Sequence, residues 1–277
     1  MKGSYESNGA QLSYRESGDG MPVVFLHPTP VDHEYWQPLV DELAGVWAIA
    51  PDLRGHGASE LGTNLPVGGF ARVPDAPVLT IGQLASDTLA LLDHLGLDEA
   101  VFAGCSIGGY VLMELWRRAP ERMRGLAIVC SKPQPDAEAN LEKRAATIAR
   151  ARAGETSALF DGMAQSLIGA TARARHPQIE AEMRARMTVT PEALVAVHAG
   201  LATRQDSLPT VNTIQVPVLA IAGGEDPTTT PAEMEVYKAA PGGCEFHLLP
   251  DGGHFAAYEQ PQKTAALMAE WLRLLGN

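Results

Sequence analysis

Cysteines and long apolar runs are both scarce in this sequence of 277 residues. The three cysteines, Cys105, Cys130 and Cys244, are odd in number and widely spaced, which fits neither a disulfide framework nor a paired-cysteine zinc site. We therefore expect them to be reduced and mostly buried. The apolar runs at 22–26 and 216–222 are far shorter than the ~20 residues that span a bilayer, so no membrane span is expected.

Positive charge is also in short supply. Lysine and arginine total 21 against 33 aspartates and glutamates, which gives a net charge of −12. This balance repels phosphate backbones and anionic lipid head groups, so neither nucleic acid nor a membrane is expected as a partner. The first residues lack the apolar region of a secretory signal, which predicts a cytoplasmic protein. An apolar content of 45% with 19% charged residues is ordinary for a globular protein.

Strand and helix patterns alternate along most of the chain. Short apolar runs predict strands at 11–16, 22–26, 46–50, 100–105, 126–130, 216–222 and 245–249. Apolar residues at helical spacing predict helices at 36–43, 81–95, 107–118, 232–239 and 261–275. This order predicts an α/β fold with a mostly parallel central sheet flanked by helices.

Two segments interrupt the alternation. Residues 133–212 are rich in Ala, Arg, Glu and Met, show several helical periods and contain no convincing strand, which predicts an inserted helical cap or lid. Residues 1–132 and 213–277 would then form one α/β core. Residues 63–79 are rich in proline and glycine and predict an irregular loop of unusual length, where functional residues often lie.

The strongest chemical motif is Gly104-Cys105-Ser106-Ile107-Gly108, between a predicted strand and a predicted helix. A nucleophilic serine on such a turn needs glycines two residues to either side, and the following helix N-terminus favours negative charge. The motif therefore predicts Ser106 as a nucleophile. Cys105 is a poor alternative, because Ala103 and Ile107 stand where its glycines would have to be.

A serine nucleophile needs a base, and the base needs an orienting carboxylate. His254 follows a predicted strand on a pair of glycines, and we predict it to be the base. Asp226 follows the preceding predicted strand and is the predicted acid, with its neighbour Glu225 as the alternative. Asp251 is close to His254 in sequence and is expected to shape the turn instead.

The sequence resembles the α/β-hydrolase fold, and within it the soluble serine esterase, lactonase and non-haem peroxidase-like branch. The chain order Ser106, Asp226, His254 is the order found in this fold. Four further motifs carry the resemblance, which covers nearly the whole chain: Phe25-Leu26-His27-Pro28, Ala50-Pro51-Asp52-Leu53-Arg54-Gly55-His56-Gly57-Ala58-Ser59, Gly223-Gly224-Glu225-Asp226 and Gly252-Gly253-His254. The resemblance implies a catalytic triad at a nucleophile elbow.

The resemblance also implies an oxyanion hole made of two backbone N–H groups. Ile107 would supply one of them. The family usually has His-Gly in the loop that supplies the other, whereas this chain has His27-Pro28-Thr29-Pro30. Proline has no N–H, so Thr29 is the predicted donor, and a rigid turn without a catalytic role is the alternative.

Further residues are expected to line the substrate pocket or to support it. The pocket candidates are His33, Trp36, Phe160, Met163, Leu167 and Phe255, with a core position equally open for Trp36. Residues near the predicted catalytic loops are expected to fix loop geometry, namely His27, Asp52, Arg54 and His56. The sequence contains no metal-ligand motif and no glycine-rich nucleotide loop after a strand, so neither a metal nor a cofactor is expected.

Together these patterns predict a serine hydrolase that cleaves a small or medium apolar carboxylic ester or lactone through an acyl-enzyme on Ser106. A C–C bond hydrolase, a thioesterase, and an acyltransferase or perhydrolase with the same triad are alternatives. A non-hydrolytic ligand receptor or a cofactor-free lyase is an alternative from another class. The sequence does not indicate an oligomeric state.

Overall fold

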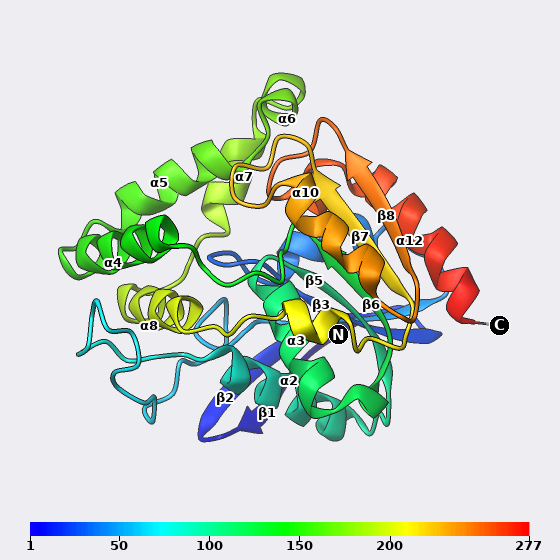
Figure 1. The fold of residues 1–277 in the computed structure, drawn as a ribbon, viewed down its shortest axis with the longest axis horizontal. Coiled ribbons are helices and arrows are strands. Elements are labelled where there is room, and N and C mark those ends of the chain that lie inside the picture. The colour runs from blue at the N-terminus through cyan, green and yellow to red at the C-terminus, as the bar shows by residue number, and fades with distance from the viewer. Residues whose placement is uncertain (277) are drawn as a thin grey trace.

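The computed structural model describes residues 1–276, and its central element is an eight-stranded sheet (Figure 1). The strands follow the spatial order β1-β2-β4-β3-β5-β6-β7-β8. The pairs β1–β2 and β2–β4 are antiparallel, and the pairs from β4 across to β8 are parallel. The strand bounds are β1 (Lys2–Ser7), β2 (Ala10–Ser17), β3 (Met21–Leu26), β4 (Val46–Pro51), β5 (Ala100–Cys105), β6 (Met123–Val129), β7 (Val218–Gly223) and β8 (Cys244–Leu249).

The middle strands are apolar on both sides because helices cover both faces of the sheet. In β3, Val23 and Phe25 face one apolar core, while Val24 and Leu26 face the other. Every residue of β5 and of β7 is buried, which is typical of a central parallel strand. Because β3 to β8 run in one direction, the loops after them emerge at the same edge of the sheet. This edge holds the predicted catalytic residues.

The core helices form one layer on each face. The side chains of α2, α3 and α10 belong to one apolar core, and those of α1 and α12 belong to the other. α2 begins after the N-cap Thr80 and ends at Gly96, whose φ of 67° is a conformation that glycine adopts without strain. The bounds are α1 (Gln37–Val40), α2 (Ile81–Leu95), α3 (Ile107–Arg118), α10 (Pro231–Met234), α11 (Ala256–Glu259) and α12 (Pro261–Leu275), with 3₁₀-helices η1 (His33–Trp36), η2 (Pro120–Arg122) and η3 (Glu235–Ala239).

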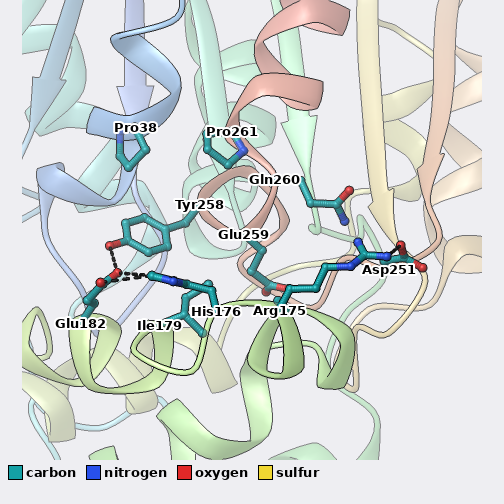
Figure 2. A pocket seen from close by; sticks show the side chains of 11 residues that line it. Pro38, Arg175, His176, Ile179, Glu182, Asp251, Tyr258, Glu259, Gln260 and Pro261 are labelled. Carbon is teal, nitrogen blue, oxygen red and sulfur yellow. Dashed lines mark hydrogen bonds and ion pairs between the residues drawn. The ribbon is translucent and has the colours of Figure 1, made fainter.

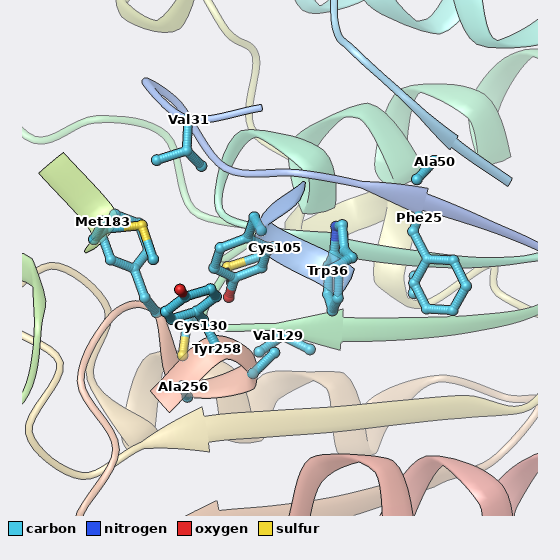
Figure 3. Close-up of a cluster of buried hydrophobic side chains, with 14 of the residues drawn as sticks. Phe25, Val31, Trp36, Ala50, Cys105, Val129, Cys130, Met183, Ala256 and Tyr258 are labelled. Carbon is cyan, nitrogen blue, oxygen red and sulfur yellow. Dashed lines mark hydrogen bonds between the residues drawn. The ribbon is translucent and has the colours of Figure 1, made fainter. Parts of the chain in front are cut away.

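Residues 133–212 connect β6 to β7 and gather to one side of the sheet (Figure 1). Met183 of this segment lies in the same buried cluster as Val31, Trp36 and Tyr258 (Figure 3), so the segment shares an apolar core with the sheet. The helices of the 133–212 segment are α4 (Glu138–Arg152), α5 (Thr156–Leu167), α6 (Ala170–Arg175), α7 (Ile179–Ala185), α8 (Pro191–Ala202) and α9 (Leu208–Val211).

The α/β class and the mostly parallel sheet agree with the sequence prediction. Three local predictions were wrong. The strand β1 was missed because its polar residues alternate with the buried Tyr5 and Ser7, which leaves no apolar run. The helix predicted at 36–43 is divided between η1 and α1, and the helix predicted at 232–239 is divided between α10 and η3. Among residues 1–276, no helix is both long and apolar enough to cross a membrane.

Candidate active site

The turn between β5 and α3 places Ser106 in a strained backbone conformation. Its φ is 52° and its ψ is −115°, and it is one of the few non-glycine residues with positive φ. A Cβ on Gly104 would lie 2.6 Å from the carbonyl carbon of Gly108, and a Cβ on Gly108 would lie 2.2 Å from the carbonyl oxygen of Leu26. Both glycines are therefore required for the close approach that holds this turn.

Asp226 and His254 lie side by side, although 28 residues separate them in the sequence. Nδ1 of His254 is 2.8 Å from Oδ2 of Asp226, and both side chains are buried. Oδ1 of Asp226 accepts the N–H of Thr228 at 2.7 Å and that of Thr229 at 3.1 Å. The hydroxyl of Thr228 lies 2.8 Å from the same Nδ1 of His254. Asp226 thus holds one edge of the imidazole ring.

Burial alone would raise the pKa of Asp226, but the charge of His254, its hydrogen bond and the Thr228 donors bring that pKa below its usual value. Asp226 is therefore ionised at neutral pH and favours the tautomer in which Nδ1 of His254 carries the proton. Its neighbour Glu225 points elsewhere, since its carboxylate accepts the N–H of Thr171 at 2.9 Å and the Thr171 hydroxyl at 2.5 Å. Of the two acids that the sequence left open, Asp226 is the one that contacts His254.

The other ring nitrogen of His254, Nε2, has no hydrogen-bond partner within the described residues. Ser106 and His254 line the same cavity. Among residues 1–276, the side chains of Ser106 and His254 form no hydrogen bond with each other. Such bonds are often long before substrate is bound.

Thr29 and Ile107, the two predicted oxyanion donors, both have backbone N–H groups without a protein acceptor among residues 1–276. Ile107 is the first residue of α3, so its N–H has no acceptor within the helix. Thr29 lines the cavity together with Ser106, and within the described residues its N–H has no protein acceptor. The hydroxyl of Thr29 lies 2.9 Å from Nε2 of His56, and the bond from Thr29 to Pro30 is cis.

Buried histidines connect the loops behind Thr29. His27 lies 2.9 Å from the carbonyl of Pro28 through Nδ1, and its Nε2 accepts the N–H of Leu53 at 2.9 Å. Burial, reinforced by the nearby His56, lowers the pKa of His27 to about 3. A neutral ring is what the accepting Nε2 requires. The loops after β3 and β4 are thereby joined.

Acids and an arginine hold the rest of these loops. Asp52 accepts the N–H of His33 and that of Ala58, and Arg54 forms a buried ion pair with Asp87. The contacts of Asp52 and Arg54 hold the loops in place, which is the role expected for these two residues.

Ser106 and His254 open into a cavity of about 460 Å³. Two of the predicted pocket residues, Met163 and Leu167, line it. Charged side chains also line it, which the sequence analysis did not anticipate. The lining residues from the core include Thr29, Pro30, Tyr110, Lys132, Pro227, Thr228, Thr230 and Glu233, and those from the 133–212 segment include Asp136, Asn140, Lys143, Arg144, Thr147, His198 and Leu201.

Four predicted pocket residues do not line this cavity: His33, Phe160 and Phe255, whose prediction was wrong, and Trp36, for which the core position left open by the sequence is the observed one. His33 is turned toward Asp52, with Nδ1 at 2.7 Å from Oδ1. Trp36 is fully buried against Phe25, at 5.4 Å between ring centroids (Figure 3). Phe255 is fully buried beside Tyr35, and Phe160 lies beneath the guanidinium of Arg184. No residue of the long loop 63–79 lines the cavity either. The aromatic rings of Trp36, Phe160 and Phe255 pack in the apolar core instead.

The cysteines are free, and two of them are fully buried, as expected. Sγ of Cys105 accepts the Tyr35 hydroxyl at 3.2 Å. Burial raises the pKa of the Cys105 thiol well above its ordinary value. Cys105 therefore carries no thiolate at neutral pH and packs as a small apolar residue.

Comparison with known proteins identifies the family. A sequence profile described as the alpha/beta hydrolase family matches residues 23–267. The chain belongs to this family. It is similar to 3-oxoadipate enol-lactonase 1 of Acinetobacter baylyi, at 26% identity over 96% of this chain and 94% of the relative. A malate-bound thermophilic esterase from Thermogutta terrifontis superposes with a TM-score of 0.89 at 28% identity, covering all of both chains. An enol-lactonase from Burkholderia xenovorans LB400 gives 0.86 at 26% identity, over 98% and 100%.

One acid of this alpha/beta hydrolase that the sequence analysis missed supports the His254 loop. The half-buried carboxylate of Glu259 accepts the N–H of Gly253 at 2.7 Å and that of Phe255 at 3.1 Å, on either side of His254. It also accepts the N–H of Gly169, in the 133–212 segment, at 3.1 Å. The N–H of His254 itself donates to the carbonyl of Leu167 at 2.8 Å. No sequence motif marks Glu259, because its partners are all backbone groups.

A second cavity, of about 270 Å³, lies where α6 and α7 meet α11 (Figure 2). Its polar groups are largely paired with one another: the Tyr258 hydroxyl donates to Glu182 at 3.3 Å, and Arg175 lies 2.9 Å from Asp251. It contains no side chain of the Ser106 site. Among residues 1–276, no group of three or more His, Cys, Asp and Glu side chains is arranged to hold a metal ion.

Proposed function

We propose that this alpha/beta hydrolase cleaves a carboxylic ester or a lactone through an acyl-enzyme on Ser106. The observation that carries the proposal is the arrangement of His254, which is held by Asp226 at Nδ1 while its Nε2 is free in the cavity that contains Ser106. The similarity to enol-lactonases and an esterase over almost the whole chain supports ester or lactone chemistry.

In the proposed reaction, Nε2 of His254 takes the proton of the Ser106 hydroxyl as Oγ attacks the carbonyl carbon. The negative charge on the tetrahedral oxygen is stabilised by the N–H groups of Thr29 and Ile107, and loss of one such donor typically costs ~10²- to 10³-fold in turnover. Asp226 stabilises the imidazolium. His254 then protonates the leaving oxygen, and in the second half it activates water to release the acyl group.

The proposal is tested with a fluorophosphonate probe and a panel of phenyl acetate, a γ-lactone and a thioester. We expect labelling of the wild type at Ser106, none of Ser106→Ala, and a ~10³-fold or larger loss of ester turnover in that variant. Ser166→Ala, an exposed serine on α5, is the matched control and should behave as wild type. An unlabelled Ser106 together with no turnover on any of the three substrates would contradict the proposal and favour a receptor or lyase.

A further inference from the structure

The wall of the Ser106 cavity that helix α4 supplies is polar and cationic. Asn140, Lys143, Arg144 and Thr147 of α4 all line it. Their spacing of three, four and seven residues places them on one face of the helix. The buried Ile148, on the neighbouring face of α4, belongs to the apolar core. Helix α4 therefore turns a row of hydrogen-bonding and charged groups toward the cavity.

The charges at this wall do not cancel. Asp136 is shared by two arginines, with Nε of Arg144 at 2.6 Å from Oδ2 and Nη2 of Arg204 at 3.0 Å from Oδ1. Burial would raise the pKa of Asp136, but the two arginines hold it below its usual value, so the group is ionised. One carboxylate thus faces two guanidinium groups, of which only that of Arg144 lines the cavity.

Two lysines complete the cationic side. Nζ of Lys132 lies 2.6 Å from Oε1 of Glu233, and this pair is neutral overall. Lys143 lines the cavity and forms no ion pair with any residue between 1 and 276. Of the charged side chains that line the cavity, Lys132, Lys143 and Arg144 are cationic and Asp136 and Glu233 are anionic. The wall therefore carries about one excess positive charge in a chain whose net charge is −12. Low-dielectric walls concentrate such a local field on whatever enters the cavity.

A buried histidine at the same wall has an unused hydrogen-bonding atom. His198 of α8 lines the cavity with only 7% of its surface exposed, and its buried Nδ1 has no hydrogen-bond partner among the described residues. Burial, followed by the charge of Arg144, lowers the pKa of His198 to about 3, so the ring is neutral. A buried polar nitrogen without a partner calls for an explanation, and a ligand or a water molecule in the cavity would supply the missing hydrogen bond.

We infer that the cavity binds an ester or lactone whose acyl group carries a carboxylate, and that Lys143 and Arg144 bind this carboxylate with His198 beside them. The inference rests on the proposed function and names its substrate class. The acyl side is the relevant one, because a lactone keeps its whole skeleton on the serine after ring opening. Met163, Leu167 and Leu201 line the same cavity and provide apolar contacts for the carbon chain. This replaces the wholly apolar substrate expected from the sequence.

The test uses two substrates that differ only in charge: phenyl hydrogen glutarate, and phenyl 4-carbamoylbutanoate with an amide in place of the carboxylate. For the wild type, we expect kcat/KM to be roughly tenfold higher for the anionic ester, with the ratio falling as salt is added. Lys143→Met should bring the ratio close to one, mainly through a higher KM for the anionic ester. Lys143 is exposed, so this variant should fold.

Arg150→Met is the matched control, because Arg150 lies on α4 but outside the cavity and pairs with Glu155. It should keep the wild-type ratio. A ratio near one in the wild type, or a Lys143→Met variant that keeps the full preference, would overturn the inference while leaving ester hydrolysis intact.

A binding measurement separates this inference from the proposed function. Calorimetry of glutarate with Ser106→Ala needs no turnover, and we expect binding that Lys143→Met added to this variant weakens roughly tenfold. Glutarate binding without hydrolysis of either ester would support the carboxylate subsite and count against the proposed reaction. Hydrolysis of both esters at equal rates, without glutarate binding, would count against the subsite alone.

Discussion

The two walls of the cavity are built in different ways. The core wall places Ser106, Thr228 and His254 on short turns whose backbones are in close contact. A Cβ on Gly223, for example, would lie 2.3 Å from the carbonyl oxygen of Gly253. The part of the other wall that α4 supplies consists of half-exposed or exposed side chains on one helix face: Asn140, Lys143, Arg144 and Thr147. Substitution of side chains on α4 therefore disturbs the fold less than substitution at the core turns.

This difference suggests that the core wall carries out the reaction and that the α4 wall selects the substrate. Groups that must act within a few tenths of an ångström lie on turns after parallel strands, where packing leaves little freedom. Groups that select a substrate by charge tolerate looser placement, because an electrostatic attraction falls off slowly with distance. We therefore expect core-wall substitutions to change turnover on all esters, and α4 substitutions to change the preference among esters.

The largest effect is expected from Asp226→Asn. The amide would present an N–H to Nδ1 of His254, which favours the tautomer whose Nε2 carries a proton and cannot act as a base. We expect kcat to fall by ~10⁴-fold on both the anionic and the amide ester. The measurement is steady-state kinetics at neutral pH, with the melting temperature recorded in parallel.

Glu225→Gln is the control for Asp226→Asn, because it removes the neighbouring charge without touching His254. Its carboxylate binds Thr171 instead. The expected loss is below ~10-fold, since only a loop contact changes. A loss in Glu225→Gln that equals or exceeds that of Asp226→Asn would show that the acid has been assigned to the wrong residue.

A medium effect is expected from Glu259→Gln. The substitution replaces one of the two carboxylate oxygens by an NH₂ group, which cannot accept a hydrogen bond. Either the N–H of Phe255, bound at Oε1, or those of Gly253 and Gly169, bound at Oε2, lose their acceptor. We expect a loss of ~1–3 kcal/mol in unfolding free energy, because buried donors lose their acceptor. Since the His254 loop shifts, kcat should fall by ~10-fold by the same factor on both esters.

Equal loss on the two esters distinguishes a positioning role of Glu259 from a contact with substrate. Glu270→Gln, at an exposed position on α12, is the control and should leave both values unchanged. A Glu259→Gln variant with altered preference between the anionic and the amide ester would contradict the positioning role. It would also contradict the expectation that only the α4 wall sets the preference among esters.

The core wall was largely predictable from sequence, and the α4 wall was not. The turn at Ser106 is specified locally, because its glycines, strand and helix are contiguous in the chain. The proximity of Asp226 and His254 follows from strands that end at one edge of the sheet. By contrast, Lys143 and Arg144 lie on a helix face that resembles any solvated face. Their importance depends on Asp136 and His198, which come from other parts of the 133–212 segment.

For two aromatic residues the sequence prediction failed in the opposite way, because it suggested pocket positions for residues that lie in the core. Trp36 and Phe255 follow the candidate loops in sequence, and this nearness suggested a place in the pocket. Their direction is set by the core beneath them, where both side chains are fully buried. Packing of large apolar surface outweighed nearness along the chain, since burying such a side chain contributes roughly 1.5–3 kcal/mol.

The smallest effect is expected from His33→Asn, which tests whether His33 belongs to the support of the loops rather than to the cavity. Burial would lower the pKa of His33, but its hydrogen bond to Asp52 and the charge of that group raise the pKa above the ordinary value. The folded protein therefore holds this proton more tightly than the unfolded chain. The resulting stabilisation is complete below the ordinary pKa of ~6.5 and is lost as the pH rises through the folded value.

We expect the difference in unfolding free energy between wild type and His33→Asn to be at most ~1 kcal/mol at pH 6 and to shrink toward pH 9. His176→Asn, at an exposed position, is the control for loss of a histidine. Because His33 lies outside the cavity, kcat/KM should stay within about twofold on both esters. A changed preference between them would return His33 to the substrate pocket.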